Sequence, residues 1–356
     1  MAIEFPDHLV HLILLYLPVV SLLRFKSVCR SWRSLIESSS FIYQHLDHHQ
    51  HQQQQLIALY PHEGEITSLS SDPIHVPIDK NFWSLKLIAS CNGLVVLHHE
   101  DEGYVYLWNP ATKQLRSLPQ SPAPWPFELL DNDGEFPMGF GFDDTNNDYK
   151  IVRFYVAQPS EHEYKFRLEI YNLSTDSWRV VGEEVAAGLP TIQHIFCDPK
   201  EPYQKKVYLW AAAVDTPTQE SMHFDETIIY FDFSKEVFGT IALPDEPLRH
   251  YRSMAIIREK VVWICQPDGD QSSTYDIWLM NEFGNQNSWS KAYKIGPFDI
   301  VRWAIGFTGS MQDEKLLLYA NGQLCLYDLV TQETQNLTLE GSFDAVAYKE
   351  SLVPII

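Results

Sequence analysis

The stretch FPDHLVHLILLYLPVVSLLRFKSVCRSWRSLI, residues 5–36, determines how this chain begins. Pro6 and Asp7 stand where a helix start is expected, and Pro18 ends the segment. Between them the apolar residues follow the i, i+3, i+4, i+7, i+8 spacing of one helix face, at Leu9, Leu12, Ile13, Tyr16 and Leu17. The spacing predicts an amphipathic helix at the N-terminus.

Two more short helices are predicted over residues 21–28 and 31–37. Ser21 is the expected N-cap of the first, and the second carries an aromatic and two aliphatic side chains. Three short helices bury too little apolar surface to be stable alone, so we expect the apolar side chains left over to dock on an outside partner. The alternative is a helical cap whose apolar side chains pack on the rest of the chain.

The same residues resemble the F-box, position after position. The matching segments are Phe-Pro-Asp-His-Leu (5–9), Ile-Leu-Leu-Tyr-Leu-Pro (13–18), Ser-Leu-Leu-Arg-Phe (21–25), Val-Cys-Arg-Ser-Trp (28–32) and Leu-Ile (35–36). Phe5 stands where the family usually has leucine, a conservative apolar change. The resemblance implies binding to a Skp-type adaptor and, through it, to cullin and RING subunits. The adaptor-binding residues that it implies are Pro6, Leu9, Ile13, Leu17, Pro18, Leu22, Phe25, Val28 and Trp32.

A run rich in histidine and glutamine follows the helices. Residues 45–55 read HLDHHQHQQQQ, which has little to bury and is expected to be a solvated linker. Its four histidines allow a metal site, but no cysteine stands beside them, so the solvated linker is favoured.

Beyond residue 56 the apolar period changes to about 2, as in β-strands separated by turns. One pattern recurs: an apolar strand, a second strand ending in an aromatic residue or leucine, an Asn or Asp, a polar turn and a further strand. The copies contain residues 107–115, 170–178, 230–238, 278–289 and 326–334. Meanders at intervals of about 40 to 60 residues favour a β-propeller, because such a sheet buries both faces only when neighbours stack on it.

Apolar runs at the two ends of this region lie outside the repeats. They cover residues 56–60 and 74–78 at the start and 343–348 at the end. If these runs share a blade, they close the ring and remove its exposed edges, which favours six blades. An irregular β-sandwich is the alternative architecture.

The β-region resembles the plant F-box-associated domain, which is related to kelch-type repeats. Residues 90–94 (SCNGL), 108–112 (WNPAT) and 139–143 (GFGFD) carry the resemblance, which covers most of residues 84–340 but lacks the Gly-Gly doublet of kelch repeats. The nearest resemblance is to the S-locus-F-box-like and defence-regulator-like group. Together with the repeats, it predicts an α+β multidomain chain with a three-helix F-box (1–44), a linker (45–55) and a kelch-like propeller (56–356), for which the terminal runs favour six blades.

Composition limits the partners. The chain of 356 residues has 26 Lys+Arg against 47 Asp+Glu, and its charge of -21 repels nucleic acid and anionic membranes. Glu4 and Asp7 precede the apolar run 9–23 and Pro18 divides it, so we expect neither a signal peptide nor a membrane span. Five scattered cysteines are typical of a reducing compartment, and we expect a cytoplasmic or nuclear protein.

The sequence predicts no catalytic, cofactor-binding or metal-binding residues. His98-His99-Glu100-Asp101-Glu102 is interpreted as a solvated hairpin, because it lacks a further ligand at fixed spacing. Asp143-Asp144 has the residue types of an acid–base pair, but neighbours on an extended chain point in opposite directions, which favours a turn. Gly139-Phe140-Gly141 lacks the third glycine and the following helix of a dinucleotide site.

These patterns favour a non-catalytic receptor subunit of a ubiquitin ligase. Its F-box would dock on the ligase, and its β-domain would capture an unidentified protein target for ubiquitination and degradation. The alternative is a carbohydrate-binding or glycoside-processing propeller with a helical cap. No target contact is assigned, but the candidate loop residues are Trp125, Glu128, Asp131, Asp133, Glu135 and the segment 215–226.

Overall fold

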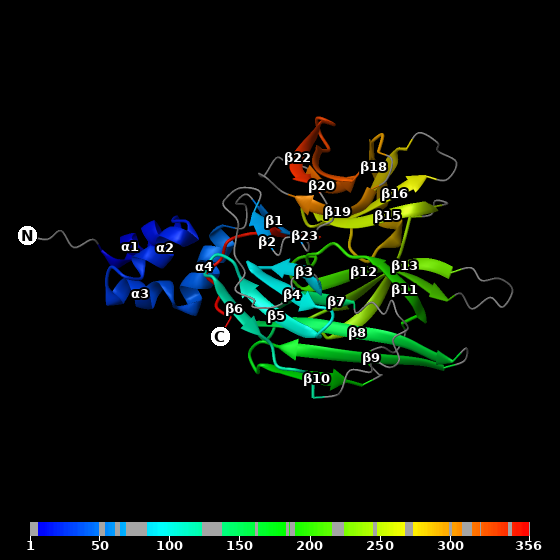
Figure 1. The fold of residues 1–356 in the computed structure, drawn as a ribbon. Helices are drawn as coiled ribbons and strands as arrows, with labels where there is room; N and C mark the ends of the chain where they lie inside the picture. The colour runs from blue at the N-terminus through cyan, green and yellow to red at the C-terminus, as the bar shows by residue number, and fades with distance from the viewer. Residues whose placement is uncertain are drawn as a thin grey trace, which may run out of the picture.

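The computed structural model places a small helical region beside a larger all-β region (Figure 1). Helices α1 to α4 form the first region, and strands β1 to β23 form the second. The structure describes residues 6–49, 54–60, 65–68, 84–122, 137–160, 163–182, 185, 189–215, 224–244, 248–267, 273–298, 301–307, 315–320, 322–340 and 344–355.

The helical region has four α-helices within the described residues, not three. They are α1 (Asp7–Leu15), α2 (Val19–Phe25), α3 (Arg30–Ile36) and α4 (Ser39–His48). The first three lie close to the predicted helices. Ser21 is inside α2, whose N-cap is Pro18, so the capping role predicted for Ser21 is wrong.

Helix α4 replaces the first part of the expected linker. Ser38 caps it by accepting a hydrogen bond from the backbone N–H of Phe41 at 3.3 Å. Phe41, Ile42 and His45 are buried on one side of this helix. His45 to His48 are therefore helical rather than solvated linker, because packing on this side holds the last turn of the helix in place.

The β-region contains five four-stranded antiparallel sheets within the described residues. Hairpins join consecutive strands in each sheet, and the first strand contacts a neighbouring sheet. The sheets are β3 (Leu85–Cys91), β4 (Leu94–His99), β5 (Tyr104–Asn109), β6 (Gln114–Ser117); β7 (Met138–Asp143), β8 (Asp148–Ser160), β9 (Glu163–Asn172), β10 (Ser177–Val181); β11 (Ile192–Cys197), β12 (Val207–Asp215), β13 (Phe224–Asp232), β14 (Val237–Ala242); β15 (Leu248–Ile257), β16 (Lys260–Pro267), β17 (Tyr275–Met280), β18 (Trp289–Ile295); β19 (Val301–Phe307), β20 (Lys315–Ala320), β21 (Gln323–Asp328), β22 (Thr334–Glu340).

The two ends of the β-region meet in a smaller sheet. Strand β1 (Gln55–Tyr60) pairs with β2 (Glu65–Ser68) on one side and with the last strand, β23 (Asp344–Tyr348), on the other. The predicted pairing of the terminal runs is therefore observed, while residues 74–78 lie outside the described residues. Counted as four-stranded blades, the described chain forms five and not six, because its start and end together supply only three strands to this sheet.

The sheets contact one another in ring order, as in a propeller and not a sandwich. Strand β23 contacts both β3 and β19, so the three-stranded sheet lies between the first and the last four-stranded blades. Pairing the start of the β-region with its end closes the ring, because one sheet holds both ends of the chain between the two neighbouring blades.

The glycines of Gly139-Phe140-Gly141 allow neighbouring blades to pack closely. A Cβ atom on Gly139 would lie 2.7 Å from the indole ring of Trp210, and one on Gly141 would collide with the ring of Phe233. Larger residues would separate β7 from the sheet of β11 to β14. This motif therefore serves packing.

The C-terminal tail ties the two regions together. Asn109 donates hydrogen bonds from Nδ2 to the backbone oxygens of Ser351 and Val353, at 3.2 and 2.8 Å. Figure 1 shows the tail passing between α4 and β6. One buried apolar cluster contains residues of the helices, the propeller and the tail, including Leu14, Leu22, Phe41, Phe140, Leu352, Val353 and Ile355.

Two expectations from composition concern the N-terminal run and the cysteines. Residues 9–23 lie in α1 and α2, which Pro18 separates. Within the described residues, none of the helices has the length and apolar character needed to cross a bilayer. All five cysteines carry free thiols, as expected from their scattered positions.

Candidate functional site

The helical region carries an exposed apolar surface. Six of its large apolar side chains are at least 40% exposed, and we call them the apolar patch: Leu9, Leu12, Ile13, Tyr16, Val20 and Val28. The propeller, within its described residues, has only three comparable side chains, Val180, Val237 and Val330. Exposed apolar side chains concentrated on so small a region indicate a protein-binding surface.

Helix α1 has two apolar sides, and this explains the patch. Leu14 is fully buried, and Val10 packs against the same core. On the other side, Ile13 is 54% exposed and Tyr16 is 66% exposed. The stripe predicted from the sequence is therefore mainly the exposed side of the helix, while the core-facing side was missed.

The nine residues predicted to bind an adaptor lie at different depths. Pro6, Leu9, Ile13, Pro18 and Val28 are exposed. Leu17, Phe25 and Trp32 are partly buried, and Leu22 is fully buried beneath them. The prediction did not include Leu12, Tyr16 and Val20, although the helical spacing in the sequence had already placed Leu12 and Tyr16 on the exposed stripe.

Histidines of α4 hold the end of α1 in position. His45 Nε2 donates to the backbone oxygen of Leu17, and His49 Nε2 donates to that of Leu15, both at 2.9 Å. Burial lowers the pKa of His45 to about 4, so its neutral ring is the donor. Burial also lowers the pKa of His49. These bonds satisfy carbonyl groups that the end of a helix leaves free, and they fix the orientation of α1.

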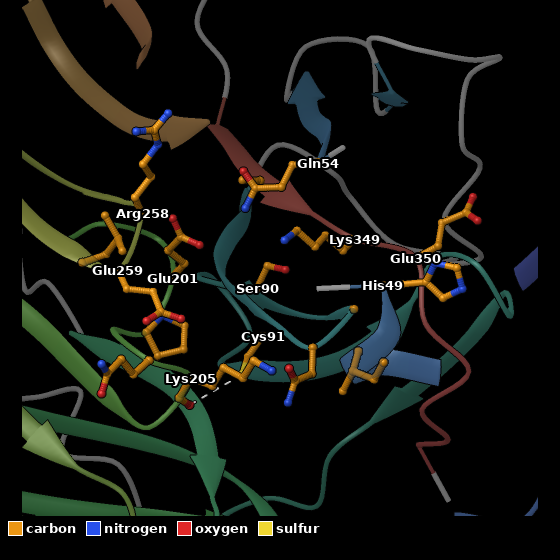
Figure 2. A pocket seen from close by; sticks show the side chains of 17 residues that line it. His49, Gln54, Ser90, Cys91, Glu201, Lys205, Arg258, Glu259, Lys349 and Glu350 are labelled. Atoms are coloured by element: carbon orange, nitrogen blue, oxygen red, sulfur yellow. Dashed lines mark hydrogen bonds between the residues drawn. The ribbon is translucent and has the colours of Figure 1, made fainter. Parts of the chain in front are cut away.

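A cavity of about 480 Å³ lies between α4 and the propeller (Figure 2). Leu46 of α4 and His49, the C-cap residue of that helix, line one side. The rest comes from the β3–β4 turn, the segment before β12, the β15–β16 turn and the end of β23, and includes Ser90, Cys91, Asn92, Gly93, Glu201, Pro202, Gln204, Lys205, Ile256, Arg258, Glu259, Ala347, Lys349 and Glu350. Residues far apart in the sequence therefore build one pocket.

Two charged groups of this cavity, Glu201 and Lys349, are poorly solvated. Burial raises the pKa of Glu201 to about 8, although Lys349 opposes this shift. Burial lowers the pKa of Lys349, against the influence of Glu201. Glu201 is only half-buried by exposed area, but it stands in a concave pocket where protein atoms replace much of its water. Both groups are thus displaced towards their neutral forms.

The motifs considered for catalysis have structural roles. Asp143 is buried and accepts from Lys150 Nζ at 2.5 Å, whereas Asp144 is exposed and accepts from Ser234 Oγ at 2.7 Å. The two carboxylates therefore diverge, as expected of a turn. His98 and His99 are buried at the end of β4, so their interpretation as part of a solvated hairpin is wrong.

Metal and nucleophile chemistry find no support in the described residues. No group of three or more His, Cys, Asp or Glu side chains is arranged there to hold a metal ion. In the cavity, burial raises the pKa of the Cys91 thiol to about 12, which keeps it protonated and unreactive.

The candidate target loops fall largely outside the described residues. This applies to Trp125, Glu128, Asp131, Asp133 and Glu135 and to most of the segment 215–226. Of that segment, Glu226 on β13 forms an ion pair with Arg252 on β15, which links neighbouring sheets. That contact gives Glu226 a structural role.

Two family models match the chain. The model of the F-box domain matches residues 3–44, and that of the F-box associated beta propeller domain matches residues 58–355. The two matched ranges correspond to the helical region and to the ring of sheets.

Similar curated proteins come from Arabidopsis thaliana. F-box/kelch-repeat protein At3g23880 is 30% identical over 326 residues, which cover 83% of this chain and 81% of that protein. F-box protein At3g08750 is 26% identical over 301 residues, which cover 83% and 74%. Among solved structures, a chain of the nidogen/laminin complex gives a TM-score of 0.48 at 10% identity, covering 84% of this chain and 99% of that one, a similarity too low to inform function.

Proposed function

This chain belongs to the plant F-box proteins that carry an F-box-associated β-propeller, and on this basis we propose that it is the substrate-recognition subunit of an SCF-type ubiquitin ligase. In this role the F-box binds a Skp-type adaptor, which connects to cullin and RING subunits. The propeller captures a target protein for ubiquitination and proteasomal degradation. The chain itself contributes proximity, since the chemistry belongs to other subunits.

The apolar patch is the observation that carries the adaptor-binding step. Leu9, Leu12 and Ile13 belong to α1 and Val20 to α2. Tyr16 is the C-cap residue of α1, and Val28 follows α2. Covering half-exposed side chains of this size stabilises a complex by about 1 kcal/mol each. We therefore extend the nine predicted adaptor contacts by Leu12, Tyr16 and Val20.

The direction of the propeller strands indicates which face of the propeller is accessible to a target protein. The β3–β4 and β15–β16 turns line the cavity beside α4, so they lie on the face nearest the F-box. Because strands alternate in direction, the last residues of β4, β8, β12 and β16 lie at the opposite face. We place the target on that face, where the F-box and its adaptor leave it accessible.

The proposal includes the compartment. Five free thiols suit the reducing cytoplasm or nucleus, where ubiquitin ligases of this type act on their targets. Fractionation of cells that express the tagged chain tests this point, and enrichment in a secreted fraction would contradict it.

Direct binding of the purified full chain to a recombinant Skp-type adaptor tests the function. We expect the Leu12→Ala/Ile13→Ala variant to bind at least about 30-fold more weakly, because it removes two exposed side chains from the centre of the patch. The matched control is Val180→Ala/Val237→Ala, which removes equally exposed apolar side chains from the propeller and should leave binding unchanged.

Two outcomes would overturn the proposal. A folded wild-type chain that does not bind the adaptor would contradict it and favour the carbohydrate-module alternative. A patch variant that binds as tightly as the wild type would show that the adaptor contacts another surface.

A further inference from the structure

The cavity between α4 and the propeller lies apart from the apolar patch and from the face assigned to the target. Its volume of about 480 Å³ is within the range of pockets that hold small molecules. Leu46 of α4, Pro202 before β12 and Ile256 of β15 give it apolar walls from both regions. The cavity therefore has room and apolar surface for a small ligand.

The segment before β12 supplies two charged side chains, Glu201 and Lys205, to the lining of the cavity (Figure 2). Within the described residues, neither the Glu201 carboxyl group nor the Lys205 ammonium group forms a hydrogen bond or an ion pair. Burial raises the pKa of the Cys91 thiol, and the positive charge of Lys205 opposes this shift. Since Cys91 also lines the cavity, the charge of Lys205 acts on its interior.

Neighbouring blades hold this segment in place. The N–H of Ser90, on β3, donates to the backbone oxygen of Lys200 at 3.0 Å. The N–H of Phe142, on β7, donates to the backbone oxygen of Lys205 at 2.7 Å. Lys205 has a φ of 66°, which is unfavourable for a long side chain, and such strain is concentrated at binding sites. Glu201 and Lys205 therefore stand on a backbone that is fixed at both ends.

The protonation state of Glu201 decides which charge a ligand brings. Burial raises the pKa of Glu201 to about 8, so at pH 7 its carboxyl group is mostly protonated and is an O–H donor without an acceptor among the described residues. A carboxylate on the ligand accepts that hydrogen bond and is attracted by Lys205. An ammonium group would be repelled by Lys205 and would first have to displace the proton of Glu201. The cavity therefore favours an anion over a cation.

We propose that this cavity binds a small carboxylic acid with an apolar body, in its carboxylate form. The carboxylate of the ligand accepts a hydrogen bond from Glu201, Lys205 attracts it, and the apolar body lies against walls that include Leu46 and Ile256. Because the ligand touches both α4 and the propeller, its binding stabilises the position of the F-box on the propeller.

Affinity for the carboxylate should fall as the pH rises, because Glu201 donates only while it is protonated. With a pKa of about 8, the protonated fraction of Glu201, and with it the affinity, falls about tenfold between pH 7 and pH 9. At pH 8 binding should take up about half a proton from the buffer. Calorimetry in phosphate and in Tris, whose ionisation enthalpies differ widely, measures that proton.

Glu201→Gln separates this titration from that of the other groups in the cavity, because the amide still donates a hydrogen bond but does not titrate. The other titratable or charged side chains of the lining are His49, Cys91, Lys205, Arg258, Glu259, Lys349 and Glu350. The variant should bind the carboxylate at pH 7 within about threefold of the wild type, and its affinity should stay constant from pH 7 to pH 9.

The probe is 3-phenylpropionate, titrated into the purified full chain at pH 7. We expect binding and a raised melting temperature. The matched probes are 3-phenylpropionamide, which lacks the charge, and 2-phenylethylamine, which carries the opposite charge. The amide should bind at least about fivefold more weakly than the carboxylate, and the amine at least about tenfold more weakly.

Two further variants test the two groups singly. Glu201→Ala removes the donor and should lose at least about tenfold in affinity for 3-phenylpropionate. Lys205→Met removes the attracting charge and should weaken 3-phenylpropionate at least about fivefold, while its affinity for the uncharged amide should not change.

Controls separate lost binding from lost folding. The unliganded Glu201→Gln chain should melt no lower than the wild type at pH 8, because an amide avoids burying a charge. Glu100→Gln and Lys86→Met, at an exposed ion pair outside the cavity, should bind 3-phenylpropionate normally.

Several outcomes would overturn the proposal. One is that 3-phenylpropionate, 4-methylpentanoate and octanoate all fail to bind at about 10 mM. Equal or tighter binding of 2-phenylethylamine, or a wild-type affinity that does not fall from pH 7 to pH 9, would overturn it as well. So would the same fall in Glu201→Gln as in the wild type, or unchanged binding of 3-phenylpropionate by Lys205→Met.

Discussion

In most proteins apolar side chains are buried and charged side chains are exposed, and the two regions of this chain depart from that pattern in opposite ways. The helices leave six large apolar side chains exposed, while the propeller buries charged side chains, among them Lys150, Arg153 and Glu169. Exposed apolar surface is unfavourable until a partner covers it. Buried charge is unfavourable unless it is paired, and in the propeller it is paired: Arg153 Nη2 lies 2.6 Å from Glu169 Oε2.

The difference shows which region is complete by itself. Lys150 Nζ donates to Asp143 at 2.5 Å, to Glu236 at 2.7 Å and to the backbone oxygen of Phe233 at 3.1 Å, and so joins two neighbouring blades. Burial alone would raise the pKa of Asp143, but hydrogen bonds from Lys150 and Asn146 hold it below its usual value. The Lys150 cluster of the propeller satisfies its buried charges internally, whereas the apolar patch of the F-box lies uncovered.

The largest effect should come from breaking that buried cluster. We expect Lys150→Met to lower the free energy of unfolding by about 3–5 kcal/mol, because it leaves Asp143 buried without its cation. Urea denaturation followed by tryptophan fluorescence measures it. The control is Lys86→Met at the exposed Lys86–Glu100 pair, where the loss should stay below about 1 kcal/mol. Equal effects of the two substitutions would refute the distinction.

Neighbouring residues of α1 should separate stability from adaptor binding. We expect Leu14→Ala to cost about 3 kcal/mol in unfolding free energy, because it opens a cavity under the helix. Ile13→Ala should change the unfolding free energy by less than about 0.5 kcal/mol and yet weaken adaptor binding. Denaturation and adaptor titration of both variants test the contrast, and a stability loss in Ile13→Ala similar to that in Leu14→Ala would remove it.

The smallest of these effects concerns His45. Its pKa is about 4 in the folded chain, against the ordinary histidine value of 6.5, so between these values the unfolded chain binds more protons than the folded chain. Stability from this group is present above pH 6.5 and is lost as the pH falls towards 4; between pH 6.5 and about pH 5 the loss is about 2 kcal/mol.

Denaturation of the wild type and of His45→Gln at several pH values isolates this contribution. The glutamine amide can still donate to the backbone oxygen of Leu17 but does not titrate, so the difference between the two chains should change across this pH range. A difference that is constant from pH 7 to about pH 4 would show that His45 does not titrate as inferred.

The sequence was most informative where the signal is local. The spacing from Leu9 to Tyr16 predicted α1, and the strand–turn–strand repeats predicted the all-β ring, because helical and strand periods depend on residues close together in the chain. The pairing of residues 56–60 with 343–348 was also inferred, because a ring of sheets requires its ends to meet.

Only the tertiary structure decided which apolar side of α1 is buried, that His45 belongs to a helix, and that the terminal sheet has three strands within the described residues. The cavity and the Lys150 cluster were equally out of reach of the sequence. Glu201 and Lys349 are far apart in the chain, as are Lys150 and Glu236. Their burial and electrostatics arise only when the folded chain brings them together and removes water from between them, and no local pattern records this.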